Sequence, residues 1–418
     1  MKKIELLSPA GNLEKLKIAF NYGADAVYGG VSHFSLRLKS GKEFDEASFQ
    51  EGINYAHRLG KKVYVTINGF PFTSQLKLLR NHIAKMRDMG PDAIIVSTPG
   101  VIKLVREIAP GMPIHLSTQA NVLNYLDAEV FYDMGVTRII AAREMSLKDL
   151  EEIKKHIPDM ELEMFVHGAM CFAFSGRCLI TSLQTGRVAN RGSCANDCRF
   201  PYTVYVENPE TKVLMRIEET EEGSYIFNAK DLNLSSYVKD IVDSGIIDSI
   251  KIEGRTKSPY YAGVTARAYR MALDDAYAGH FDPAKYQAEL ETTKNRGFSE
   301  GYIFNRPHEK DDQNLETSIS EGTYDVLALV DESGEYFMTK GKIEPGTVAE
   351  LVLPIGFDAE LADNEIGRVY EEGGRFYIQF KKVLTQDGTE MASIHSGNTN
   401  PVRLPVKLPP YTFLRSTL

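Results

Sequence analysis

The four cysteines of this 418-residue chain are Cys171, Cys178, Cys194 and Cys198, and all of them fall within 28 consecutive positions. Cysteine thiolates bind zinc and iron–sulfur clusters. A group this dense is a poor fit to unrelated buried thiols spread through a core. We therefore expect the four side chains to serve one site.

The spacing of the cysteines, C-x6-C-x15-C-x3-C, favours an iron–sulfur cluster. Structural disulfides would need an oxidising compartment, and the amino-terminal sequence MKKIELLSPAGN has too short an apolar run for a secretory signal. Structural zinc sites usually contain C-x2-C pairs, and this chain has none. Four thiolates on one irregular loop suit a 4Fe-4S cluster. Zinc remains the alternative.

Alternating strand and helix patterns precede and follow these cysteines and predict repeated βα units. Eight apolar segments read as strands buried on both faces: Ile4–Leu7, Ala26–Tyr28, Val63–Ile67, Ala93–Val96, Pro113–Leu116, Arg138–Ala141, Leu162–Val166 and Ser249–Ile252. Several of the helical patterns between them end at a glycine. We predict a TIM-like (β/α)8 barrel, with a doubly wound open sheet as the alternative.

Two breaks in this pattern suggest the domain organisation. Within a barrel domain of residues 1–280, residues 168–228 show no clear helix and carry all four cysteines, which predicts a cluster-binding insertion after strand seven. Residues 281–320 resemble a connector. Residues 321–418 predict a small all-β barrel that docks or stabilises, with strands at Tyr324–Val330, Tyr336–Lys340, Ala349–Leu353, Gly367–Tyr370, Arg375–Phe380 and Met391–Ser393.

Charge and hydrophobicity restrict the partners of the chain. It has 48 basic and 57 acidic residues, for a formal net charge of −9, so a nucleic acid would have to meet a local basic patch. No uncharged apolar run is long enough to cross a membrane. We expect a cytoplasmic protein with no membrane partner.

Five short motifs resemble the signature of the collagenase-like peptidase family U-32. They are Glu163-Met-Phe165-Val-His167-Gly168-Ala-Met-Cys171, Gly176-Arg-Cys178, Asn190-Arg191-Gly192-Ser-Cys194 with Cys198-Arg199, Lys230-Asp231-Leu232 and Lys251-Ile252-Glu253-Gly254-Arg255. The resemblance extends over the barrel and the β module. Asn196-Asp197 stands where Gln-Pro is more usual, which puts the subgroup in doubt but leaves the cysteines intact.

The resemblance implies two different activities. The family name records proteolysis, of collagen in particular. Related members are RNA hydroxylation proteins, which act on ribosomal RNA or convert the wobble uridine of tRNA to 5-hydroxyuridine, with prephenate biosynthesis implicated. Others hydroxylate a quinone precursor without oxygen and carry a 4Fe-4S cluster on the same four-cysteine pattern. The resemblance thus implies RNA hydroxylation supported by a cluster, or a peptidase.

Protease signatures are absent from the sequence. It contains no H-E-x-x-H and no G-x-S-x-G motif. Asp243-Ser244-Gly245 reads as a turn between a helix and strand eight. A Cys171–His167 pair could act as nucleophile and base, but it would leave three cysteines unexplained. A single cluster accounts for all four.

Polar residues at the ends of the predicted strands indicate a pocket, since barrel active sites lie at that edge. His167 and Glu253 are the candidate acid–base groups. Arg143 and Arg255 could hold a small dicarboxylate such as prephenate with bidentate forks, or could form a structural Arg–Glu network. His167 could equally be an outer partner that hydrogen-bonds the cluster.

Four further residues are candidates for binding substrate. Gln119 and Asn121 follow strand five and offer amide groups. Arg191 and Arg199, beside Phe200, offer the charge and stacking surface that an extruded base would need, although they could simply pack the cysteine loop. We predict an iron–sulfur protein that takes part in hydroxylating an RNA base, most simply a tRNA uridine. A peptidase acting on peptides and a non-enzymatic scaffold with a structural cluster are the alternatives.

Overall fold

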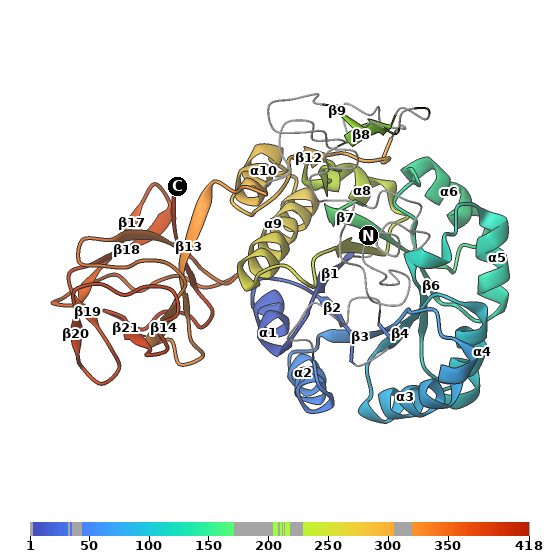
Figure 1. Cartoon of the computed structure of the whole chain (residues 1–418), viewed down its shortest axis with the longest axis horizontal. Coiled ribbons are helices and arrows are strands. Elements are labelled where there is room, and N and C mark those ends of the chain that lie inside the picture. Colours follow the sequence, from blue (N-terminus) through green and yellow to red (C-terminus); the bar gives the residue numbers. More distant parts are fainter. Residues whose placement is uncertain are drawn as a thin grey trace.

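A closed parallel barrel forms the centre of the computed structural model (Figure 1), which describes residues 3–31, 34–35, 44–170, 204–207, 210, 212, 214–217, 229–304 and 320–417. Its strands are β1 (Glu5–Pro9), β2 (Ala26–Gly29), β3 (Lys62–Ile67), β4 (Ala93–Val96), β5 (Ile114–Leu116), β6 (Arg138–Ile140), β7 (Glu161–Ala169) and β11 (Ser249–Ile252). Pairing of β11 with both β1 and β7 closes the sheet. The predicted TIM-like barrel is confirmed, and the open sheet is excluded.

Helices form the outer layer of the barrel (Figure 1). They are α1 (Leu13–Asn21), α2 (Glu46–Arg58), α3 (Leu76–Met89), α4 (Pro99–Ile108), α5 (Tyr125–Asp133), α6 (Leu147–His156), α8 (Val238–Ser244) and α9 (Pro259–Ala278), with 3-10 turns at Thr73–Gln75, Thr118–Ala120 and Ser235–Tyr237. Asn, Asp and Ser side chains cap several of the amino-terminal ends, as Asp45 does for α2 and Ser146 for α6. No helix in the described ranges is long and apolar enough to span a membrane.

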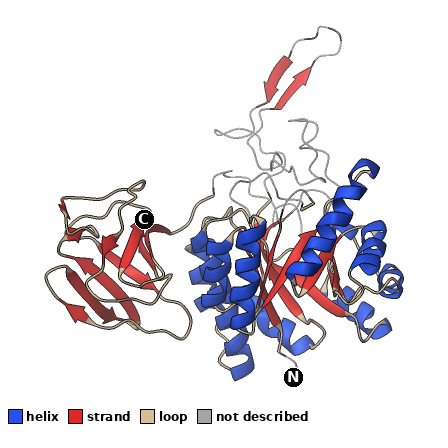
Figure 2. Cartoon of the chain, turned by 90° about the horizontal axis from the view of Figure 1, so that it is seen from below, coloured by secondary structure: helices blue, strands red, loops and turns tan. Residues whose placement is uncertain are grey.

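Four short strands lie outside the barrel, three of them between β7 and β11 in the chain and one after β11. The strand β10 (Asp231–Asn233) pairs antiparallel with the end of β7, and β12 (Phe298–Ser299) pairs with β10. A hairpin of β8 (Val204–Glu207) and β9 (Leu214–Ile217) lies beyond the barrel on the side opposite the N-terminus (Figure 2). The segment predicted as a connector contains a helix, α10 (Pro283–Glu291), as well as β12.

The carboxy-terminal module is a curled antiparallel sheet with its own apolar core. Its strands are β13 (Tyr324–Val330), β14 (Tyr336–Thr339), β15 (Val348–Val352), β16 (Ala362–Asp363), β17 (Gly367–Glu372), β18 (Arg375–Phe380), β21 (Val402–Arg403) and β22 (Phe413–Thr417), with a separate β19 (Val383–Leu384) and β20 (Glu390–Met391) ladder. The sequence did not indicate β22, although β22 joins β13 to β15. A strand was expected at Met391–Ser393, and the structure ends it at Met391.

The module packs directly on the barrel. A shared apolar cluster joins α1 and α9 of the barrel to β13, β15 and β22 of the module, with Tyr22 and Phe413 fully buried within it. The Tyr22 hydroxyl donates to the carbonyl oxygens of Val352 and Tyr411. The two parts therefore share one interior.

Candidate active site

A small polar cavity of about 70 Å³ lies at the carboxyl ends of the barrel strands. Residues on, or just after, every barrel strand except β1 line it. Barrels place their chemistry at this edge because the loops that follow the strands converge there. We take this cavity as the candidate active site.

Arg143, three residues after the end of β6, has a buried guanidinium that makes no close ion pair with any residue the structure describes. Its side chain is 6% exposed, and its nearest carboxylate is Glu253, at 3.8 Å. Its guanidinium carbon lies 3.8 Å from the centre of the Phe165 ring. In the described part of the chain Arg143 donates no hydrogen bond. Buried donors are nearly always satisfied, so Arg143 is positioned to bind a ligand.

Arg255 and Glu253 follow β11 and line the same cavity. One guanidinium nitrogen of Arg255 donates to the hydroxyls of Ser35 at 2.8 Å and Thr66 at 3.1 Å. The Glu253 carboxylate accepts from the Tyr28 hydroxyl at 3.2 Å. The structure thus brings Arg143, Glu253 and Arg255 together at one cavity. We expected this from the sequence, because each of them follows a predicted barrel strand.

Lys251 is a lining residue to which the sequence analysis gave no role. Its ammonium donates to Glu163 at 2.8 Å and lies 4.3 Å from the centre of the Tyr28 ring. Burial lowers the pKa of Lys251, and the Glu163 carboxylate partly opposes that effect. The sequence contained a sign of this role, because a lysine on a buried strand must find a buried partner.

Gln119 belongs to an amide and hydroxyl corner of the cavity. It follows β5 in a 3-10 turn, and its side-chain oxygen accepts from the Asn68 amide at 3.0 Å and from the Ser117 hydroxyl. Asn121, the residue that ends this turn, has a positive φ of 59° and does not line the cavity. The structure therefore places Gln119 in the cavity and Asn121 outside it.

His167 lies apart from the cavity. Glu163 and Phe165 face the barrel interior, and alternation along β7 would send His167 the same way. An extra residue in β7 interrupts the pairing, since Lys251 pairs with Phe165 and Ile252 with His167. This bulge turns the imidazole outward, where the rings of Tyr261, Tyr269 and Phe298 surround it at 5.6–5.8 Å.

Burial lowers the pKa of His167 to about 4, so the imidazole is neutral at physiological pH. The Tyr269 hydroxyl lies 3.5 Å from its Nδ1 atom. A neutral, enclosed imidazole is poorly placed to exchange protons with a ligand in the cavity. The position of His167 near the end of β7 fits the alternative expectation for this residue, that it hydrogen-bonds the cluster from outside.

The cysteines Cys171, Cys178, Cys194 and Cys198, with Arg191 and Arg199, lie outside the described residues. The ends of the segment that carries them are described, and they meet. Asp231 of β10 pairs with Ala169 of β7, so the chain leaves and re-enters the fold at one place. A buried ion pair between Asp231 and Arg296 holds this base. The end of β7 also contacts the candidate site, since the backbone N–H of the lining residue Glu253 donates to the His167 carbonyl at 2.9 Å.

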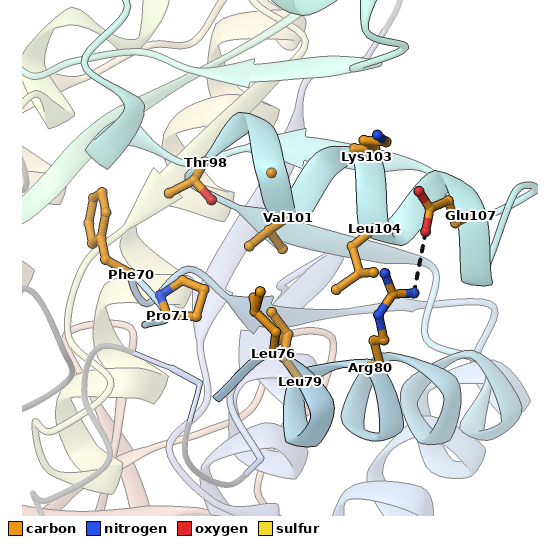
Figure 3. Close-up of a pocket in the computed structure, with 11 residues that line it drawn as sticks. Phe70, Pro71, Leu76, Leu79, Arg80, Thr98, Val101, Lys103, Leu104 and Glu107 are labelled. Atoms are coloured by element: carbon orange, nitrogen blue, oxygen red, sulfur yellow. Dashed lines mark hydrogen bonds and ion pairs between the residues drawn. The ribbon is translucent and has the colours of Figure 1, made fainter. Parts of the chain in front are cut away.

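A second and larger hollow of about 410 Å³ lies between α3 and α4 (Figure 3). Apolar side chains such as Leu79 and Leu104 form its floor, and an ion pair between Arg80 and Glu107 at 3.3 Å crosses one end. Its walls offer no buried acid or base pair. The smaller cavity at the strand ends is therefore the better candidate for chemistry.

Comparison with known proteins gives consistent matches. A model of peptidase family U32 matches residues 11–313. The chain is 59% identical over 418 residues to tRNA hydroxylation protein P of Helicobacter pylori, covering 100% of this chain and 99% of that protein. It is 42% identical to tRNA hydroxylation protein P of Escherichia coli, covering 88% and 90%. It is 35% identical to the 23S rRNA 5-hydroxycytidine C2501 synthase of Escherichia coli, covering 65% and 39%.

Proposed function

Because this chain belongs to peptidase family U32, and resembles tRNA hydroxylation proteins over its full length, we propose that it takes part in hydroxylating a base of RNA. The near-complete coverage of the Helicobacter pylori relative carries this proposal. The candidate active site supports it, since a cavity at the barrel mouth has cations and a carboxylate in reach of one ligand. The location that suits this role is the cytoplasm.

The substrate we propose is a tRNA uridine, converted to 5-hydroxyuridine in a reaction linked to prephenate. The guanidinium of Arg143 and that of Arg255 line the cavity and would neutralise a small dicarboxylate. Glu253 is the acid–base candidate that lies in the cavity. Arg191 and Arg199, on the cysteine segment, would meet the RNA.

We propose that Cys171, Cys178, Cys194 and Cys198 hold a 4Fe-4S cluster, which would supply electron transfer. The pairing of β7 with β10 closes the base of their segment next to the candidate site, which supports this assignment. Anaerobic purification with iron and sulfide analysis tests it. About four irons and four sulfides per chain are expected, and a Cys171→Ala variant should lose them. Bound zinc would contradict the cluster.

Nucleoside analysis tests the proposed activity. Deleting the gene should remove 5-hydroxyuridine and its derivatives from tRNA, as measured by mass spectrometry, and the wild-type chain should restore them. A variant without the cysteines serves as the inactive control. An unchanged nucleoside profile in the deletion strain would refute RNA hydroxylation by this protein.

A collagenase-like peptidase is the second candidate, favoured by the description of the matching family. Cluster-loaded protein that cleaves gelatin, and loses this activity in Glu253→Gln, would support it. A third possibility is a scaffold with a structural cluster. Loss of function in Glu253→Gln or Arg255→Ala protein that retains its fold would count against the scaffold.

A further inference from the structure

The orientation of the Gln119 side chain is set by its neighbours. Its carbonyl oxygen accepts from the Asn68 side-chain amide at 3.0 Å and from the Ser117 hydroxyl. Turning the Gln119 amide over would bring its NH2 group against the Asn68 NH2 group and lose the hydrogen bond between the two side chains. The carbonyl end of Gln119 is therefore occupied by the protein.

The NH2 end of Gln119 remains available. Gln119 lines the cavity, and in the ranges that the structure describes its NH2 group has no hydrogen-bond partner. An NH2 group held in this way can only donate. This corner of the cavity thus presents a donor that is neutral and fixed in direction.

The charged residues of the lining have the same bias. Arg143, Lys251 and Arg255 are donors only, and Glu253 is the one carboxylate among the described lining residues. A ligand that complements this lining carries several acceptor oxygens. Uracil has two carbonyl oxygens, whereas cytosine presents an amino group in place of O4.

We infer that Gln119 is a specificity residue whose NH2 group donates to the O4 keto oxygen of uracil, so that the site takes uracil and rejects cytosine. The inference rests on the proposed RNA hydroxylation and names the base that the site selects. Cytosine would direct its own amino group at the Gln119 NH2 group and leave both donors unpaired. One mispaired contact of this kind discriminates by about tenfold or more.

A Gln119→Glu substitution reverses this preference, because a carboxylate can accept from the cytosine amino group. The carboxylate can also still accept from Asn68 and Ser117, so the local structure should persist. Gln379→Glu is the matched control, since Gln379 is exposed on β18 of the module. Both variants add one negative charge to the chain.

The experiment supplies cells that lack the endogenous protein with a target tRNA and with the same tRNA carrying cytidine at the modified position. Mass spectrometry measures 5-hydroxyuridine and 5-hydroxycytidine. The product ratio should fall by about tenfold or more in Gln119→Glu and stay unchanged in Gln379→Glu. An unchanged ratio in Gln119→Glu overturns the inference. Absence of both products in the wild type refutes the proposed function instead.

A binding measurement decides the case in which Gln119→Glu forms neither product. Two RNA stem-loops that differ only by uridine or cytidine at the target position are titrated against anaerobically purified protein by fluorescence anisotropy. The wild type should bind the uridine form about tenfold more tightly, and Gln119→Glu should lose this preference. Equal affinities in the wild type, or an equal preference in both proteins, overturn the inference. If Gln119 instead bound the carboxylate of a small ligand, Gln119→Glu and the wild type would show the same preference between the uridine and cytidine stem-loops.

Discussion

At the residue scale, two arginines of the barrel differ in what they bind. Arg138, inside the barrel, pairs with Glu5 at 2.6 Å and with Glu163 at 3.1 Å. Arg143, which lines the cavity, contacts Glu253 at 3.8 Å and the face of Phe165 and makes no hydrogen bond with the residues that the structure describes. The first arginine serves the fold, and the second has donors to spare for a ligand.

Substitution by methionine should separate these roles. Arg143→Met keeps the packing on Phe165, so the free energy of unfolding should change by no more than about 1 kcal/mol, while 5-hydroxyuridine formation should fall by about 100-fold or more. Arg138→Met removes a buried cation that the carboxylates of Glu5 and Glu163 share and should cost about 3–5 kcal/mol. Denaturant unfolding and nucleoside analysis measure the two effects. Full activity in folded Arg143→Met would remove this residue from the site.

His167 should make stability depend on pH. Its pKa of about 4 in the folded chain lies below the ordinary value, because burial disfavours the charged ring. The stabilisation is complete above pH 6.5, the ordinary value, and is lost as the pH falls toward 4, because the unfolded chain binds the proton first. Between pH 7.5 and 5 the free energy of unfolding should drop by about 2 kcal/mol from this group.

Denaturant unfolding at both pH values checks this prediction. His167→Asn should flatten the pH dependence by that amount. His395→Gln, which changes an exposed histidine of the module, is the matched control and should keep the wild-type dependence. A His167→Asn variant with the wild-type pH dependence would show that the imidazole is already accessible to protons in the folded chain.

At the element scale, hydrophobic runs were sufficient to predict the barrel. Each of the eight apolar segments became a barrel strand, because burial on both faces demands continuous apolar sequence. The strand ends then placed Arg143, Glu253 and Arg255 at one cavity. The β7 bulge has no such signature in the sequence. Strand alternation therefore could not show that His167 turns away from the cavity. The role of Lys251 was missed for another reason, because its partner Glu163 lies far away in the chain.

The bulged end of β7 depends on Gly168. It has a φ of +105°, and a Cβ atom there would lie 2.5 Å from the Glu253 carbonyl oxygen. That carbonyl also accepts from the Tyr261 hydroxyl at 2.7 Å. The close approach of the two backbones holds Glu253 at the cavity, and only glycine permits it.

Gly168→Ala should therefore lower the free energy of unfolding by more than backbone strain alone would. Gly279, which ends α9, has a φ of +77° and open space around it, so Gly279→Ala measures the strain by itself. The free energy of unfolding should fall about 1–3 kcal/mol further in Gly168→Ala than in Gly279→Ala. Activity should fall only in the former, because its backbone shift moves Glu253. Equal losses in the two variants would show that β7 and β11 can separate without cost.

At the scale of the whole molecule, one buried arginine joins the module to the barrel. Arg415 of β22 is 1% exposed. Its guanidinium makes paired hydrogen bonds to Glu289 of α10 and to Glu350 of β15, at 2.8–3.1 Å. A third contact reaches the Tyr260 hydroxyl of α9 at 2.8 Å. The sequence of β22 conceals this role, since a short strand with a central arginine reads as a polar end of the chain.

Loss of this guanidinium should weaken the module and the site together. Arg415→Met removes the buried cation between Glu289 and Glu350 and leaves each carboxylate with one arginine that is more exposed, Arg267 or Arg375, at a cost of about 3–5 kcal/mol. Converting both carboxylates to amides in the same chain should recover part of that cost, because it removes the negative charges that Arg415 no longer neutralises. Arg368→Met is the control, since this exposed arginine lies over the Tyr370 ring at the surface of the module and its loss should cost about 0.5 kcal/mol or less.

The effect should extend to the cavity because Tyr260 precedes Tyr261, which holds the Glu253 carbonyl, on the same turn of α9. A module that no longer docks would free this end of α9. Arg415→Met should therefore also reduce 5-hydroxyuridine formation at temperatures where the chain is still folded by circular dichroism. Normal activity in a folded Arg415→Met chain would mean that the barrel positions Glu253 without help from the module.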